Sequence, residues 1–114
     1  MRVLGIVFAG TATEHREEMS RFVAGVLGLE RIEVGGASAD MFALADGSTF
    51  AVAGPREMGG TTRSLGFLVD DLAAAVASLR AAGVEPGPVA ENDRFRYSHF
   101  RAPDGALYEL VEQR

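Results

Sequence analysis

An internal repeat constrains the fold of this chain more than any other feature of its sequence. LGIVF at 4–8 matches LGFLV at 65–69, and LADGSTFAV at 44–52 matches APDGALYEL at 102–110. The two offsets, 61 and 58 positions, are nearly equal, which indicates one structural unit built twice. We therefore interpret residues 1–114 as a single domain, with module one at about 1–54, a turn-rich linker at 55–62 and module two at about 63–114.

Both modules predict the element order β-α-β-β-β. Short apolar runs bounded by Gly and Asp-Gly turns indicate strands, and apolar residues at helical spacing indicate one helix in each module. In module one, we expect strands at 2–9, 31–34, 40–45 and 48–54, with a helix at about 13–27. In module two, we expect strands at 63–69, 84–90, 96–102 and 106–112, with a helix at 72–82.

Two such modules predict an α+β fold in which a curved eight-stranded mixed sheet carries helices on its convex face and leaves an open concave cup. Thr11 with Glu14 resembles a capping box for the first helix, and Asp71 is a cap residue for the second. Strand alternation sorts the residues between the two faces. It predicts that Leu4, Ile6 and Phe8 pack under the first helix, and Leu65, Phe67 and Val69 under the second.

Composition and charge exclude several function classes. The formal net charge is −5 and no Lys/Arg run occurs, which argues against nucleic acid and against an anionic membrane surface. The chain has no cysteine, so thiolate metal sites and Cys nucleophiles are excluded. The first residues turn acidic too early for a secretory signal, and no stretch is long and apolar enough to span a bilayer. We therefore expect a cytoplasmic protein.

The most specific stretches are SLGFLVDDLAAAVASLRAAGVE and FRAPDGALYELVE in module two. With the repeat, they make the chain resemble the vicinal oxygen chelate superfamily, which includes glyoxalase I, extradiol dioxygenases and bleomycin-resistance proteins. The resemblance covers essentially the whole chain and implies the paired-module fold. It also implies a dimer in many members. In catalytic members, it implies a divalent metal held by His and Glu from the first and last strands of each module.

The residues at the implied ligand positions argue against such a metal. The resemblance places these positions at Val3, Ala51, Ser64 and Glu109. Only Glu109 is an ordinary strong ligand, and a divalent ion normally needs three or more protein donors. We therefore predict no metal and no other cofactor, and Glu109 is the only candidate catalytic residue.

The cup face predicts a roomy, mostly apolar pocket with a few polar groups, as in many small-molecule sites. The predicted ligand-binding residues are Val7, Thr49, Ser64, Leu68, Tyr97, His99, Leu107 and Glu109. Two alternatives stay open at this point. Glu109 could contact a ligand, or be solvated or paired with Arg94, Arg96 or Arg101. His99 and Tyr97 could point into the cup or away from it.

Three functions follow from these observations. The first is a metal-free protein of the bleomycin-resistance type that sequesters a small apolar or cationic molecule and forms a homodimer. The second is an enzyme of the same superfamily, a lyase, isomerase or dioxygenase, that uses Glu109 with an unrecognised metal or as a general base. The third is an interaction module whose cup has lost its ligand.

Overall fold

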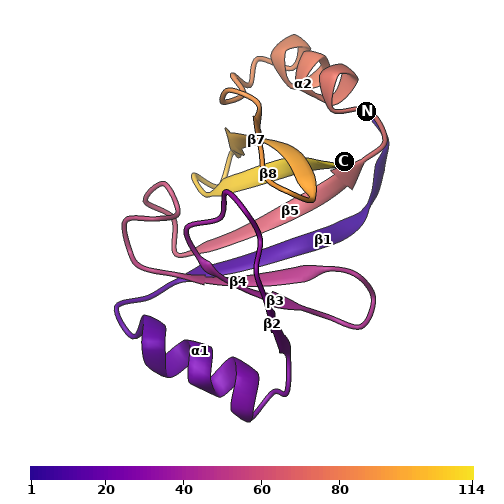
Figure 1. Ribbon diagram of the computed structural model, residues 1–114. Coiled ribbons are helices and arrows are strands. Elements are labelled where there is room, and N and C mark those ends of the chain that lie inside the picture. Colours follow the sequence, from indigo (N-terminus) through magenta and orange to yellow (C-terminus); the bar gives the residue numbers. More distant parts are fainter.

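The computed structural model describes all 114 residues as one mixed sheet with two helices (Figure 1). Module one forms the first five elements and module two the remaining five. Their order is β1 (Val3–Ala12), α1 (Arg16–Gly25), β2 (Glu30–Ile32), β3 (Asp40–Ala43), β4 (Thr49–Ala53), β5 (Arg63–Val69), α2 (Leu72–Ala81), β6 (Ala90–Glu91), β7 (Phe95–Arg101) and β8 (Leu107–Gln113).

The sheet joins the two modules edge to edge through their first strands. Its order is β2-β3-β4-β1-β5-β8-β7-β6, so β1 and β5 pair antiparallel at the centre. Each of these strands also pairs in parallel with the last strand of its own module, β1 with β4 and β5 with β8. The predicted α+β fold of two repeated modules is therefore confirmed, including the antiparallel meander of β2, β3 and β4.

The second helix follows the sequence prediction closely. The Asp71 side chain accepts a hydrogen bond from the Ala74 amide at 3.0 Å, which caps α2 as expected. Gly83, with φ of 81°, lies just beyond the end of the helix, in the left-handed conformation that favours glycine. The inward side chains of α2 pack against β5 and β8 in a core of Val69, Leu72, Ala75, Val76, Leu79 and Leu110.

The first helix begins later than predicted, and the proposed capping box was wrong. Thr11 belongs to β1, which continues to Ala12, so it cannot cap α1. His15 occupies the cap position without a side-chain cap hydrogen bond, and its amide bonds to the Thr13 hydroxyl instead. The strand predicted over 84–90 was also largely wrong, because β6 is confined to Ala90–Glu91.

Two bulges in β1 change which face its side chains occupy. The pairing register with β5 shifts between Val3 and Gly5, and again between Ile6 and Phe8. Each shift inserts one unpaired residue and therefore reverses the alternation beyond it. As a result Phe8 lies opposite Gly66 on the concave face, and the prediction that Phe8 packs under the first helix was wrong.

Helix α1 packs against β3 and β4, and α2 packs against β5 and β8, so the middle of the convex face around the first half of β1 stays uncovered. The buried core under α1 consists of Val23, Phe42 and Val52, which are residues of α1, β3 and β4. Leu4 and Ile6 stay 48% and 54% exposed, so the prediction that they pack under a helix was wrong. Leu65 also remains exposed, whereas Val69 is buried beneath α2 as predicted.

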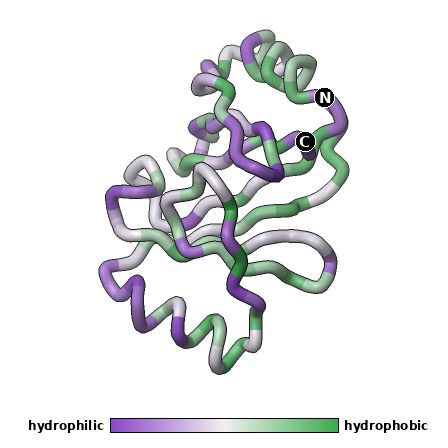
Figure 2. Tube along the Cα trace, in the orientation of Figure 1, coloured by the Kyte–Doolittle hydropathy of each residue, from purple (hydrophilic) through white to green (hydrophobic).

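The hydrophobic residues gather along the central strands and on α2 (Figure 2). No helix combines the length and apolar character that crossing a membrane would require.

Candidate functional site

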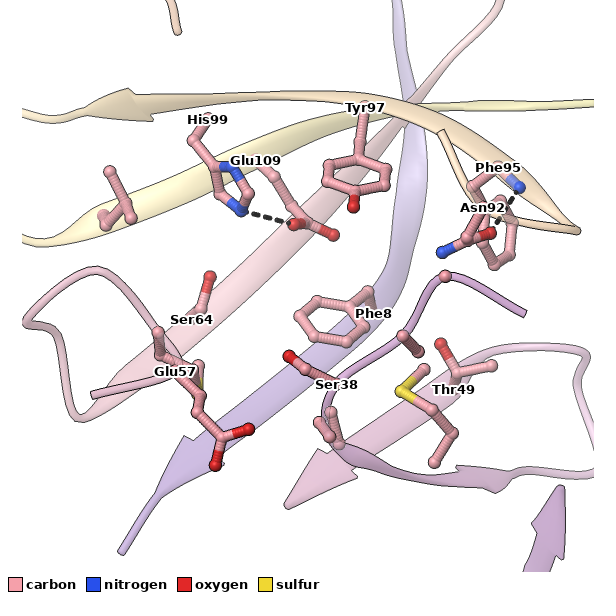
Figure 3. A pocket seen from close by; sticks show the side chains of 17 residues that line it. Phe8, Ser38, Thr49, Glu57, Ser64, Asn92, Phe95, Tyr97, His99 and Glu109 are labelled. Atoms are coloured by element: carbon pink, nitrogen blue, oxygen red, sulfur yellow. Dashed lines mark hydrogen bonds and ion pairs between the residues drawn. The ribbon is translucent and has the colours of Figure 1, made fainter. Parts of the chain in front are cut away.

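A pocket of about 160 Å³ lies on the concave face of the sheet (Figure 3). Its wall is mainly apolar, with several polar side chains placed among hydrophobic ones. The lining residues are Phe8, Gly36, Ala37, Ser38, Ala39, Met41, Thr49, Ala51, Glu57, Met58, Ser64, Asn92, Phe95, Tyr97, His99, Leu107 and Glu109. The predicted small-molecule cup is therefore present as a hollow of modest size.

The Glu109 carboxylate lies against the His99 imidazole at one end of this pocket. The two residues are register partners on β8 and β7, and His99 Nε2 lies 3.0 Å from Glu109 Oε2. Glu109 is only 8% exposed, and its other oxygen, Oε1, has no hydrogen-bond partner in the chain. None of Arg94, Arg96 and Arg101 pairs with Glu109. The alternative in which Glu109 pairs with one of these arginines is therefore excluded, because its partner is His99.

Tyr97 lies beside this pair on the same strand as His99. Its ring meets the His99 ring edge-on, with centroids 5.5 Å apart and an interplanar angle of 81°. Burial, followed by the negative charge of Glu109, raises the pKa of Tyr97 above its usual value. The phenol therefore stays protonated at neutral pH and can donate a hydrogen bond into the pocket.

Two buried hydroxyls in the pocket wall lack hydrogen-bond partners. Thr49 is 2% exposed and Ser64 is 5% exposed, and neither Thr49 Oγ1 nor Ser64 Oγ bonds to another group in the chain. Leaving a buried hydroxyl unpaired costs roughly 1–3 kcal/mol, so such groups usually have a partner. Both residues line the pocket, where a bound molecule could supply the missing partner.

Module one fills its own half of the cup with apolar side chains. The segment between β2 and β3 folds back onto the sheet, and Val34, Met41 and Ala51 form a buried cluster there. Phe8, Ala37 and Ala39 pack against the same cluster. The polar end of the pocket therefore lies over module two, and its apolar end over module one.

The register identifies the first-strand position of module one that corresponds to Ser64. Phe8 pairs with Gly66, and Gly10 pairs with Ser64. A two-fold axis between these two pairs exchanges the strands, so that Phe8 is equivalent to Ser64 and Gly10 is equivalent to Gly66. The parallel pairings agree, because Gly10 lies beside Ala51 as Gly66 lies beside Glu109. The earlier placement of this position at Val3 was wrong, because it followed the LGIVF–LGFLV match at an offset of 61, whereas the paired strands match at an offset of 56.

Phe8 makes these four positions unsuitable for a divalent ion. A Cβ added to Gly10 would lie 3.0 Å from Phe8 Cζ, so the ring extends over Gly10, between its neighbours Ala51 and Ser64. Phenyl and methyl groups do not ligate, and three or more protein donors are normally needed. No group of three or more His, Asp or Glu side chains in the chain is arranged to hold a metal.

Two pairs of contacts hold the loops that form the pocket wall. Arg16 of α1 donates to Glu57 Oε1 at 2.7 Å and to the Ser38 carbonyl at 3.0 Å, and both acceptors line the pocket. Across the cup, the Gly35 amide donates to Asp93 Oδ2 at 2.7 Å, and the Asp93 amide donates to the Gly35 carbonyl at 3.2 Å. The second pair connects the two modules above the sheet.

The structure places most of the predicted ligand-binding residues around this pocket. The predicted residues that line it are Thr49, Ser64, Tyr97, His99, Leu107 and Glu109. Tyr97 and His99 therefore lie on the face of β7 that points into the cup. Val7 and Leu68 lie outside the lining, because Val7 is the bulged residue and Leu68 pairs further along the sheet, opposite Gly5. That any of these residues binds a ligand stays a prediction.

Sequence reasoning missed several lining residues. Phe95 has the same alternation as Tyr97 and His99, so the pattern of β7 could have revealed it. Phe8 was missed because of a bulge, whose position the nearby Gly5 indicates only in general terms. Ala37, Ser38, Glu57, Met58 and Asn92 come from loops, whose path depends on tertiary contacts.

Two tandem βαβββ modules that close one curved sheet around a concave pocket define the class of this protein. The chain matches the family model of the Glyoxalase/Bleomycin resistance protein/Dioxygenase superfamily over residues 5–110, and it belongs to that superfamily. A comparison with curated proteins gives no match.

Solved structures of low sequence identity share the fold. Methylmalonyl-CoA epimerase from Mycobacterium tuberculosis has a TM-score of 0.76 and 19% identity, over 96% of this chain and 88% of that one. A variant of methylmalonyl-CoA epimerase from Streptomyces coelicolor, bound to 2-nitronate-propionyl-CoA, has a TM-score of 0.71 and 19% identity, over 97% and 95%. A superfamily member from Vibrio splendidus 12B01 has a TM-score of 0.65 and 16% identity, over 94% and 97%.

Proposed function

We propose that this protein binds a small organic molecule in the concave pocket without a metal ion, as a sequestering protein of the bleomycin-resistance type. One observation carries the proposal: the Phe8 ring extends over Gly10 among the four positions at which the superfamily resemblance places metal ligands. The pocket keeps one buried carboxylate, Glu109, and has mainly apolar walls. This is the composition of an organic-ligand site.

The size of the pocket limits the part of the ligand that it can enclose. A dry cavity of about 150 Å³ is large enough for a benzene ring, and this pocket has about 160 Å³. We therefore expect a body of one ring, or a branched aliphatic group of similar volume, to sit inside. A larger molecule would extend out of the cup.

Two measurements test the proposal together. Elemental mass spectrometry on protein purified without a metal-affinity step should show no stoichiometric divalent metal. Saturation-transfer NMR with a set of ring-sized amines, alcohols and acids should then detect binding that is unchanged by EDTA. A stoichiometric metal, or binding that EDTA abolishes, would contradict the metal-free site.

The His99–Glu109 pair favours a second candidate, a proton-transfer enzyme. Glu109 Oε1 has no partner in the chain, so it could take a proton from a carbon next to a carbonyl group. The protonated Tyr97 phenol could donate a hydrogen bond to the resulting oxyanion, and His99 could return the proton. Because Glu109 and His99 lie side by side, the proton would return to the face that lost it, so the step would exchange that hydrogen or give a positional isomer of the substrate.

Deuterium incorporation separates this candidate from simple binding. Because epimerases share the fold, methylmalonyl-CoA is a reasonable first compound to incubate with the protein in D₂O. Exchange at the carbon between its two carbonyl groups, lost in Glu109→Gln, would support the enzyme. A sequestering protein would leave this and every other bound compound unlabelled.

A further inference from the structure

We propose that the molecule held in this pocket is a protonated amine, with its ammonium group at Glu109 and its apolar body over Phe8. The inference rests on the proposed function and deepens it, because it selects cations from the apolar and cationic ligands considered above. It is carried by the charges around the pocket, by its aromatic walls and by its unpaired hydroxyls.

The lining of the pocket contains carboxylates, and His99 is its only basic side chain. No Arg or Lys is present among the lining residues, which include two carboxylates, Glu57 and Glu109. Glu57 is already paired with Arg16 at 2.7 Å, so it contributes little net charge. Glu109 is nine-tenths buried, and His99 is its one partner. A carboxylate in such a position favours a cationic partner and repels an anionic one.

Aromatic rings surround the space in front of this carboxylate. Figure 3 shows Phe8 on the floor of the pocket, with the Tyr97 ring above it and the Glu109 carboxylate to one side. A cation over such faces is attracted by the ring quadrupoles, and more strongly when it is desolvated. The faces of these rings carry negative quadrupole density and offer no favourable contact to an anion.

The unpaired hydroxyls match the hydrogen bonds of an ammonium group. An ammonium group has three N–H donors and no acceptor, so it needs several oxygen acceptors around it. Glu109 Oε1 supplies one acceptor, and Ser64 Oγ, buried and unpartnered, supplies another. Figure 3 shows the Ser64 hydroxyl on the side of the pocket facing the Glu109–His99 pair. Thr49 Oγ1, beyond Phe8, remains for a polar atom at the far end of the ligand.

Three probes of the same shape but different charge test this inference. Benzylamine, benzyl alcohol and benzoate each carry one ring and differ mainly in the charge of the group attached to it. Binding to the unmodified protein is measured by NMR titration at pH 8 and 150 mM salt, conditions under which distant charges are screened. We expect benzylamine to bind about tenfold more tightly than benzyl alcohol, which corresponds to about 1.4 kcal/mol, and benzoate not to bind.

A matched pair of variants locates the effect. Glu109→Gln should abolish the preference for benzylamine while keeping the binding of benzyl alcohol. Glu85→Gln makes the same change of charge on an exposed side chain outside the pocket, and it should leave the preference unchanged. Circular dichroism would verify that both variants fold. If one of them did not fold, the comparison of the three probes on the unmodified protein would still test the inference.

The outcomes distinguish this inference from the proposed function. Benzyl alcohol or benzoate binding as tightly as benzylamine would overturn the amine assignment and leave a small-molecule pocket. Equal loss of preference in Glu85→Gln would also overturn it, because the selectivity would then come from overall charge. If none of the three probes bound at millimolar concentration, both the amine assignment and the proposed function would fail.

Discussion

Phe8 of β1 lies directly opposite Gly66 of β5, and there is no room for a side chain between them. A Cβ added to Gly66 would lie 2.9 Å from Phe8 Cβ and 3.1 Å from Glu109 Cγ. The absence of a side chain at Gly66 therefore allows the aromatic floor and the buried carboxylate to lie close together.

Gly66→Ala should destabilise the fold by about 1–3 kcal/mol, because the added methyl group overpacks a tight site. Gly5→Ala, in the neighbouring strand, meets no atom within 4 Å and should change the free energy of unfolding by less than about 0.5 kcal/mol. Urea unfolding followed by circular dichroism measures both. A Gly66→Ala variant as stable as Gly5→Ala would contradict the packing described for Phe8.

Replacing Phe8 and Ser64 should create a metal site. Phe8→His combined with Ser64→His would place two imidazoles at matched positions beside Glu109, which completes the three protein donors that a divalent ion requires. We expect micromolar or tighter Zn²⁺ binding by calorimetry, against none in the unmodified protein. Adding Glu109→Gln to the double variant is the control and should weaken binding at least tenfold. A Zn²⁺ affinity that is unchanged by Glu109→Gln would argue against the register assignment.

The two tyrosines should titrate above their ordinary range for different reasons. Burial and the charge of Glu109 raise the pKa of Tyr97, and the hydrogen bond to Asp104 raises that of Tyr108. The chain has no tryptophan, so phenolate absorbance reports on these two groups alone. Asp104→Asn should lower the pKa of one tyrosine, and Glu109→Gln should lower that of the other by a smaller amount. If both variants shifted the same tyrosine, the assignment would be wrong.

Asp40 should make the fold sensitive to acid. Hydrogen bonds from Arg16, the principal cause, and from Ser20 lower the pKa of Asp40 below its usual value. A group with a lowered pKa in the folded state stabilises the fold above its unfolded pKa, near 3.9, and loses this contribution as the pH falls further. Asp40→Asn should therefore cost about 2 kcal/mol at pH 7 and less at pH 3. Asp70→Asn, on an exposed side chain, serves as the control in urea unfolding at both pH values.

The uncovered centre of the convex face supports the predicted homodimer. Val3, Leu4, Ile6 and Leu65 are each at least 36% exposed on adjacent strands, and contiguous apolar surface of this kind usually marks an interface. We expect a second copy to cover it, because symmetric homodimers are the commonest soluble oligomers. Light scattering should then give twice the chain mass of 12.1 kDa. Ile6→Glu should yield monomers, whereas Val89→Glu, exposed elsewhere, should not.

The architecture could be predicted because the repeat and the strand patterns are local and occur twice. Asp71 at a helix start and Gly83 at its end have direct physical roles, and both were correctly assigned. Glu109 stood out because a carboxylate interrupts an apolar strand, and it does line the pocket.

What could not be predicted depends on contacts between distant residues. The bulge before Phe8 reverses strand alternation, and it moved one aromatic ring from the expected core into the pocket. Gly5 is the one residue that hints at an irregular strand there, and it does not fix the position of the bulge. The pairing of Glu109 with His99 required knowing which face of β7 looks into the cup. The loop residues Ser38 and Glu57 reach the pocket through Arg16, which lies far from both in sequence.

The pocket is divided between the two modules. Module two supplies Ser64, Tyr97, His99 and Glu109, whereas module one supplies mainly the apolar wall around Phe8 and Met41. Substitutions in module one would therefore change the shape of the pocket while leaving the Glu109 carboxylate and its neighbours in module two in place. A duplicated fold thus lets the shape of a pocket and its polar groups be encoded in separate halves of one chain.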